Sequence, residues 1–219
     1  MKSEIYKRVN TGLLLILILI LMFISKIIYL FICLSIFSLS FVEFSKLSKQ
    51  FLKNKYFKQF LINLIFSLYL FLFLLIFIFG LNDIHFKIIL FIILLICISS
   101  DIGGIVFGKF LKGPKLTKIS PNKTISGSIG SFILSILISS ILLNYIFNTE
   151  LINNIFLGFF VSLSVQLGDL FFSYLKRKSS VKNTGNILPG HGGILDRIDG
   201  MIFVFPIVYL LIQLDLFSI

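Results

Sequence analysis

Charged residues are scarce in this chain of 219 residues, and alanine and tryptophan are absent from it. Only 13% of the residues are charged and 58% are hydrophobic, whereas soluble domains are about a quarter charged and about half apolar. This composition excludes an ordinary water-soluble domain and predicts a protein that is surrounded by lipid. The missing alanine, beside abundant Lys, Asn, Ile and Phe, is typical of an AT-rich coding bias and carries no functional information.

Cysteines and cleavage signals are also nearly missing. The two cysteines, Cys33 and Cys97, both lie inside apolar runs, which favours small buried side chains over a disulfide or a metal pair. A basic N-terminus followed by apolar residues 11–25 is similar to a signal peptide, but no small-x-small cleavage site follows and another apolar run comes at once. We therefore expect an uncleaved first helix.

Long apolar runs fill most of the chain. They cover residues 11–25, 27–44, 59–80, 86–108, 127–147, 151–172 and 201–218. A membrane-spanning helix needs about 20 apolar residues, within a range of about 17–25, so the first two runs are short. We expect an all-α, polytopic integral membrane protein with about seven transmembrane helices, of which the first two form a hairpin around Lys26. One bent helix over 11–44 is the alternative.

The basic excess follows one side of this topology. The chain has 20 Lys and Arg against nine Asp and Glu, a balance that often indicates nucleic acid. With a cytoplasmic N-terminus, however, 18 of the 20 cations fall on cytoplasmic segments, and only Lys26 and Lys87 fall outside. Because cations accumulate on the cytoplasmic side of membrane proteins, we expect no nucleic-acid partner. The loops 46–58, 109–123 and 176–200 are expected to be cytoplasmic.

Two of the few carboxylates lie where an unpaired charge raises the free energy of membrane insertion. Asp101 and Asp169 lie inside or at the edge of apolar runs, where an unpaired carboxylate costs about 2.5–3.5 kcal/mol. Asp196 and Asp199 precede the last run, so all four reach the predicted cytoplasmic face beside basic loops. Carboxylates suit a hard cation such as Mg²⁺, and the neighbouring cations suit phosphates. Structural pairing of Asp101 and Asp169 with nearby lysines is the alternative interpretation.

Two glycine clusters and one polar turn have two interpretations each. Glycines at 103, 104 and 108, and again at 190, 192 and 193, let backbone N–H groups approach an anion. Glycines also allow close helix packing in membranes. The stretch SPNKTISG at 120–127 is either an anion-binding site at the start of a helix or an ordinary helix cap.

The run SYLKRKSSVKNTGNILPGHGGILDRID at 173–199 resembles the signature of the phosphatidate cytidylyltransferases, the CDP-diacylglycerol synthases. The residues in register are Ser173, Lys176, Arg177, Lys182, Gly185, Leu188, Pro189, His191, Gly192, Gly193, Asp196, Arg197 and Asp199. Upstream, 100–109, 119–127 and 166–177 resemble the family's other polar blocks in order and spacing. The resemblance covers about the C-terminal half. It implies N-terminal transmembrane helices over 1–80 and a catalytic membrane domain over 81–219.

The resemblance implies transfer of a cytidylyl group from CTP to phosphatidate, giving CDP-diacylglycerol and pyrophosphate for phospholipid biosynthesis. It assigns Asp169, Asp196 and Asp199 as Mg²⁺ ligands and, together with Lys182, as catalytic residues. The implied substrate-binding residues are Asp101, Lys109, Lys123, Ser173, Lys176, Arg177, His191, Gly192, Gly193 and Arg197. The lipid phosphate is already an anion, so His191 is expected to donate a hydrogen bond or to shape the loop. The implied location is the inner (cytoplasmic) membrane of a bacterium, with the site on the cytoplasmic side.

The chain departs from the family pattern at acidic positions. Asn183 stands where the family has Asp, Phe172 stands where it usually has Glu, and Ile125-Ser126 replaces its Trp-Glu. The number of cations, one Mg²⁺ or Mg²⁺ with a second cation, therefore stays open, as does a homodimer. An inactive paralogue or a non-enzymatic polytopic membrane protein is the alternative function. A CDP-alcohol phosphatidyltransferase is set aside, because the residues after Gly200 run straight into an apolar helix.

Overall fold

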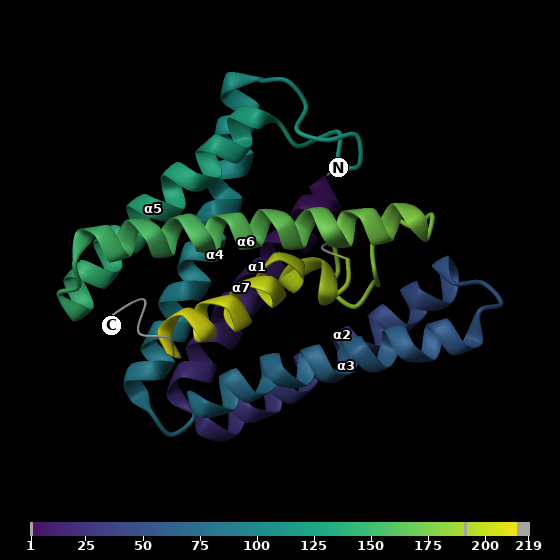
Figure 1. Cartoon of the computed structure of the whole chain (residues 1–219), viewed down its shortest axis with the longest axis horizontal. Helices are drawn as coiled ribbons and strands as arrows, with labels where there is room; N and C mark the ends of the chain where they lie inside the picture. Colours follow the sequence, from purple (N-terminus) through teal and green to yellow (C-terminus); the bar gives the residue numbers. More distant parts are fainter. Residues whose placement is uncertain (1, 191, 214–219) are drawn as a thin grey trace. The chain divides into compact units, whose positions relative to one another are not determined.

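The structure is a computed structural model that describes residues 2–190 and 192–213, and Figure 1 shows its helices. Within these residues it has seven helices and no strand. Their bounds are α1 (Lys2–Ile24), α2 (Lys26–Phe51), α3 (Tyr56–Phe79), α4 (Ile84–Leu111), α5 (Ile125–Phe147), α6 (Leu151–Lys178) and α7 (Leu195–Gln213). The expected all-α class and the seven helical segments are confirmed.

Two separate helices, not one bent helix, cover the first two apolar runs. Ser25 lies between them in an extended conformation, and its hydroxyl accepts a hydrogen bond from the Ile28 N–H at 3.4 Å. A serine that accepts such a bond is a favoured N-cap, because the first N–H groups of a helix have no partner within it. The chain therefore starts a new helix at Lys26.

Five of the described helices, α2 to α6, are long and apolar enough to cross a membrane. The apolar part of α1 is shorter and covers Val9–Ile24. Helix α7 carries Asp196, Arg197 and Asp199 in its first turns, so its described part lacks an uninterrupted apolar segment of that length. The chain is thus a polytopic membrane protein.

The helices belong to two compact units. Unit 1 comprises Met1–Asp83 and Leu175–Ile198, and unit 2 comprises Ile84–Tyr174 and Asp199–Ile219. The last turn of α6 and the first turn of α7 therefore belong to unit 1, together with the loop that joins them. The division at 80/81 implied by the resemblance stays a prediction about function.

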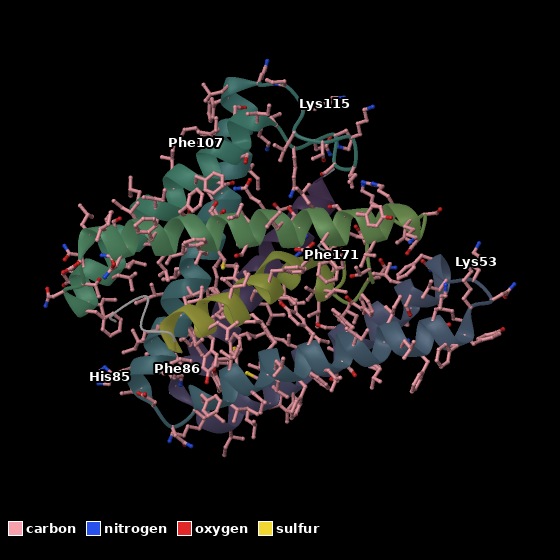
Figure 2. The ribbon with its side chains drawn as sticks, viewed as in Figure 1. Lys53, His85, Phe86, Phe107, Lys115 and Phe171 are labelled. Carbon is pink, nitrogen blue, oxygen red and sulfur yellow. The ribbon has the colours of Figure 1, made fainter. Side chains whose placement is uncertain are left out.

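In unit 1, α2 and α3 lie side by side (Figure 1). Phe44 of α2 stacks on Phe66 of α3 with ring centroids 3.7 Å apart. Farther along the pair, the Tyr29 hydroxyl donates a hydrogen bond to the Phe77 carbonyl at 2.9 Å. The basic turn between these helices includes Lys53, which is labelled in Figure 2.

In unit 2, glycines bring α4 and α5 into close contact. A Cβ on Gly103 would lie 2.8 Å from the Gly130 carbonyl carbon, and a Cβ on Gly127 would lie 2.7 Å from the Gly104 oxygen. A Cβ on Gly130 would strike the ring of Phe107, which Figure 2 labels on α4. The glycines of α4 thus serve helix packing, the second of the two interpretations given above. Thr124 caps α5 by accepting the Gly127 N–H at 3.1 Å, so residues 120–127 contain an ordinary helix cap.

Gly103→Ala is expected to lower the stability of unit 2 by about 1–3 kcal/mol, because an added methyl group in a packed contact forces the two backbones apart. The measurement is thermal unfolding of the detergent-solubilised protein. Gly12→Ala is the matched control, since nothing lies within 4 Å of a Cβ at Gly12. Equal unfolding temperatures for the two variants would contradict the close packing of α4 on α5.

Candidate active site

The signature residues form a loop between α6 and α7 in unit 1. Its centre is a tight hairpin in which Leu188 and Gly192 exchange backbone hydrogen bonds of 2.8 and 3.1 Å. Gly190 and Gly192 have φ angles of 76° and 89°, a conformation that glycine adopts without the steric cost a side chain adds. Gly190 and Gly192 are therefore required by the hairpin backbone. His191, expected to bind substrate, lies outside the described residues.

Three parts of the signature meet at the carboxylate of Asp196. Its Oδ1 accepts a hydrogen bond from the Lys176 ammonium at 2.9 Å. Its Oδ2 accepts the Thr184 N–H at 2.8 Å and the Gly193 N–H at 3.0 Å. A Cβ on Gly192 would lie 2.7 Å from the same oxygen. The end of α6, the middle of the loop and the hairpin are thus joined at one side chain in the first turn of α7.

These contacts keep Asp196 ionised. Burial by itself would raise the pKa of Asp196, but the hydrogen bonds from the Gly193 N–H, the Lys176 ammonium and the Thr184 N–H outweigh it and hold the pKa below its usual range. Hydrogen bonds to the charged form favour that form. Because the pKa is lowered on folding, the stability that Asp196 contributes is present at neutral pH. It is lost only as the pH falls below the usual range for aspartate, near pH 4.

Glu43 is a site-region residue that the sequence analysis did not single out. It lies on α2 with 1% of its surface exposed. Its carboxylate accepts the Thr184 hydroxyl at 2.8 Å, the Ile194 N–H at 3.0 Å and the Leu195 N–H at 2.9 Å. The signal that could have revealed it is its position at the end of the apolar run 27–44, the same reasoning that drew attention to Asp101 and Asp169.

In unit 2, Asp169 of α6 forms an ion pair with Lys123, which lies just before α5. The side chains are 32% and 26% exposed, respectively. Structural pairing with a lysine, the alternative interpretation given above, therefore occurs at Asp169. Nearby on α6, Gln166 accepts a hydrogen bond from Ser128 and donates one to Ser162 at 3.1 Å. This polar network ties the start of α5 to the middle of α6.

The remaining predicted site residues differ in their burial. Asp199 of α7, in unit 2, is half-buried and accepts the Gly200 N–H at 3.0 Å. Ser173 is half-buried on α6. Five others have exposed side chains: Asp101, Lys109, Arg177, Lys182 and Arg197. Of the predicted set, the structure brings together Lys176, Gly192, Gly193 and Asp196 in unit 1, and Lys123 and Asp169 in unit 2.

The positions that depart from the family pattern differ in their surroundings. Phe172 is fully buried and meets Phe203 edge-on, with ring centroids 6.3 Å apart. It is therefore part of an aromatic contact between α6 and α7. Asn183 lies beside the hairpin, since a Cβ on Gly192 would approach its side-chain amide carbon to 3.3 Å. The Ser126 hydroxyl accepts the Gly113 N–H at 3.2 Å and so holds the loop before α5.

The carboxylate oxygens of the site are suitable ligands for a hard cation, although the described residues do not form a complete set of protein ligands around one. Among the described residues there is no group of three or more His, Cys, Asp or Glu side chains placed to hold a metal ion. Mg²⁺ usually takes only one or two carboxylates and leaves its other positions to water and phosphate oxygens. Asp196 and Asp169 can each supply carboxylate oxygens to such a cation. Each of these carboxylates already forms an ion pair with a lysine ammonium.

Comparison with known proteins shows the family. The chain matches the cytidylyltransferase family over residues 1–215. It is 46% identical over 129 residues to the phosphatidate cytidylyltransferase of Rickettsia bellii, covering 54% of this chain and 55% of that protein. It is 44% identical over 118 residues to the one of Bacillus subtilis (53% and 44%) and 39% identical over 115 residues to one of Helicobacter pylori (51% and 42%).

The chain spans about half the length of these curated relatives. The family match, in contrast, runs through nearly the whole chain and includes both helical units. Membership of a nucleotidyltransferase family indicates that the protein requires a divalent cation. On the match over residues 1–215, the chain belongs to the cytidylyltransferase family.

Proposed function

We propose that this protein transfers a cytidylyl group from CTP to phosphatidate, giving CDP-diacylglycerol and pyrophosphate. The observation that carries the proposal is the junction at Asp196, where Lys176, Thr184 and Gly193 from three parts of the signature share one carboxylate. The names of the curated relatives support the choice of substrates. The apolar helices support a substrate that is itself a membrane lipid.

The reaction needs charge neutralisation and alignment more than a base. An oxygen of the lipid phosphate attacks the α-phosphorus of CTP, and the bond from that phosphorus to the bridging oxygen of pyrophosphate breaks. The attacking oxygen is already anionic at neutral pH, so no proton has to be removed from it. Fixed cations that face the developing charge lower the barrier to such a transfer. We assign this task to Lys176, Arg177, Lys182 and Arg197, with Lys109 and Lys123 as further phosphate contacts and Asp101 in the same polar region.

We assign the divalent cation, proposed to be Mg²⁺, to carboxylates of the signature region. Asp196 and Asp169 are the proposed ligands, with Asp199 as a further ligand or a partner of the bound water. A cation bound there would neutralise phosphate charge. The ionised state of Asp196 at neutral pH supports its assignment, because a divalent cation needs a deprotonated carboxylate.

We propose that the site faces the cytoplasm, where CTP is present. The basic loops support this orientation: Lys53 lies in the turn between α2 and α3, and Lys115 lies in the loop between α4 and α5 (Figure 2). Cations are concentrated in cytoplasmic loops of membrane proteins.

Single cysteines at Lys53, Lys115 and Lys182, in a background without Cys33 and Cys97, test this orientation. An impermeant thiol reagent is expected to label them only after the membrane is opened. A cysteine at Asp83 is the opposite control and should react in intact cells. Labelling of any of the three lysine positions in intact cells would contradict the cytoplasmic assignment.

The experiment that tests the function is incubation of the purified protein with CTP, phosphatidate and Mg²⁺, followed by detection of CDP-diacylglycerol. Diacylglycerol in place of phosphatidate is the control, since it lacks the attacking phosphate. A folded protein that forms no CDP-diacylglycerol under these conditions would support the alternative of an inactive relative.

A further inference from the structure

Glu43 is a buried carboxylate for which the reaction described above has no task. It lies on α2, 141 residues before Thr184 and 151 residues before Ile194, yet it binds both. Within the described residues no Lys or Arg forms an ion pair with it. Its hydrogen-bond partners among the described residues are all donors of the signature region: one hydroxyl and two backbone N–H groups.

Two glycines of the signature leave the space that this carboxylate fills. A Cβ on Gly185 would lie 2.5 Å from Glu43 Oε1, and a Cβ on Gly193 would collide with both Glu43 oxygens and with the Thr184 hydroxyl. Side chains at these positions would therefore displace the carboxylate. The absence of side chains at Gly185 and Gly193 thus makes room for the Glu43 carboxylate against the loop backbone.

One face of α2 carries further contacts to the same region. Leu47 and Phe51 follow Glu43 at intervals of four residues, and such residues lie on one side of a helix. The Leu47 carbonyl accepts the Ser179 hydroxyl at 3.4 Å, and the Lys178 ammonium lies 5.4 Å from the centre of the Phe51 ring. This face of α2 thus holds the end of α6 as well as the start of α7.

Glu43 and Asp196 both accept hydrogen bonds from Thr184 and from the segment 193–195. Thr184 donates its hydroxyl to Glu43 and its N–H to Asp196. The Gly193 N–H bonds to Asp196, and the next two N–H groups in the chain bond to Glu43. A shift of the Glu43 carboxylate would therefore move the loop atoms that fix the orientation of Asp196.

We propose that Glu43 is a positioning residue, which holds loop residues 184, 194 and 195 from α2 and thereby sets the affinity of the Asp196 region for its divalent cation. The inference rests on the proposed function. Residues that orient a metal ligand typically change metal affinity by about 10–100-fold when they are replaced. A residue with a purely structural role would change the amount or stability of the folded protein and leave the cation dependence as it was.

The test compares Glu43→Gln with wild type in two measurements. Gln keeps the shape but replaces one acceptor oxygen with a donor, so at least one N–H of residues 194 and 195 loses its partner. We expect the Mg²⁺ concentration for half-maximal turnover to rise about tenfold or more. We also expect faster hydrogen–deuterium exchange in peptides covering residues 184–195, which can be measured without turnover.

Ser40→Ala is the matched control, because Ser40 is a buried polar residue of the same helix whose hydroxyl has no hydrogen-bond partner among the described residues. It should leave both measurements unchanged. Thr184→Val removes one donor to Glu43 and should shift both in the same direction by less, and it provides the test if Glu43→Gln fails to fold. Glu43→Asp, which keeps the charge, should recover part of the Mg²⁺ affinity.

The outcomes separate this inference from the proposed function. A wild-type protein without turnover would contradict the function, while the exchange measurement would still report on the Glu43 contacts. An active wild type whose Mg²⁺ dependence and loop exchange are the same in Glu43→Gln would overturn the positioning role and leave the function in place. If Glu43→Gln does not fold, unchanged values for Thr184→Val would overturn it.

Discussion

Asp196→Asn is expected to lower the rate of CDP-diacylglycerol formation by about 100-fold or more, the scale of effect seen when a preorganised electrostatic group is removed. Asn keeps the shape of the side chain but loses the charge that pairs with Lys176 and that a divalent cation would need. The measurement is the initial rate at saturating CTP, phosphatidate and Mg²⁺, per unit of folded protein. Glu150→Gln, which removes one negative charge at an exposed position, is the control and should keep the wild-type rate.

The same substitution also tests the loop. Because Asp196 Oδ2 accepts two N–H groups, Asn must present a donor to at least one of its present partners or to Lys176. Hydrogen–deuterium exchange of residues 184–193 should therefore increase. A variant with a loosened loop and a rate within threefold of wild type would remove Asp196 from the catalytic site and leave it only a structural role.

Asp169→Asn is expected to have a similarly large effect on turnover, about 100-fold, with little effect on stability. Its partner Lys123 and the carboxylate are about one-quarter to one-third exposed, and exposed ion pairs of this kind contribute about 0–1 kcal/mol. Thermal unfolding and initial rates of the same preparation separate the two effects. If the variant unfolds at a clearly lower temperature and its lower rate is explained by a smaller amount of folded protein, Asp169 has a structural role.

The helices could be predicted well from apolar runs, whereas their ends could not. Hydropathy indicated an apolar run over 27–44, but α2 continues to Phe51, and α6 continues through the basic residues Lys176 and Arg177 to Lys178. Backbone hydrogen bonds continue where lipid ends, so a run of apolar residues defines the span and not the helix. The break between the first two helices was indicated by Lys26, which separates the two apolar runs, whereas the capping role of the Ser25 hydroxyl was not.

The candidate site could be predicted in part. The resemblance to the family signature indicated Lys176, Gly193 and Asp196, and the structure joins Lys176 and Gly193 to Asp196 by hydrogen bonds. Glu43 was missed because its partners lie more than 140 residues away, and nothing local indicates which segment a buried carboxylate will meet. The pairing of Asp169 with Lys123 was an open alternative for the same reason, since it joins α6 to the loop before α5.

The most direct test of the central claim uses CTP labelled at its α-phosphate, supplied with phosphatidate and Mg²⁺ to the purified protein. We predict that the label enters the lipid fraction as CDP-diacylglycerol, that one pyrophosphate is released for each labelled lipid, and that Asp196→Asn does neither above background. CTP labelled at its γ-phosphate should label only the pyrophosphate. A folded wild-type protein that leaves the α-label in CTP, or that releases pyrophosphate without labelling lipid, would contradict the proposed cytidylyl transfer.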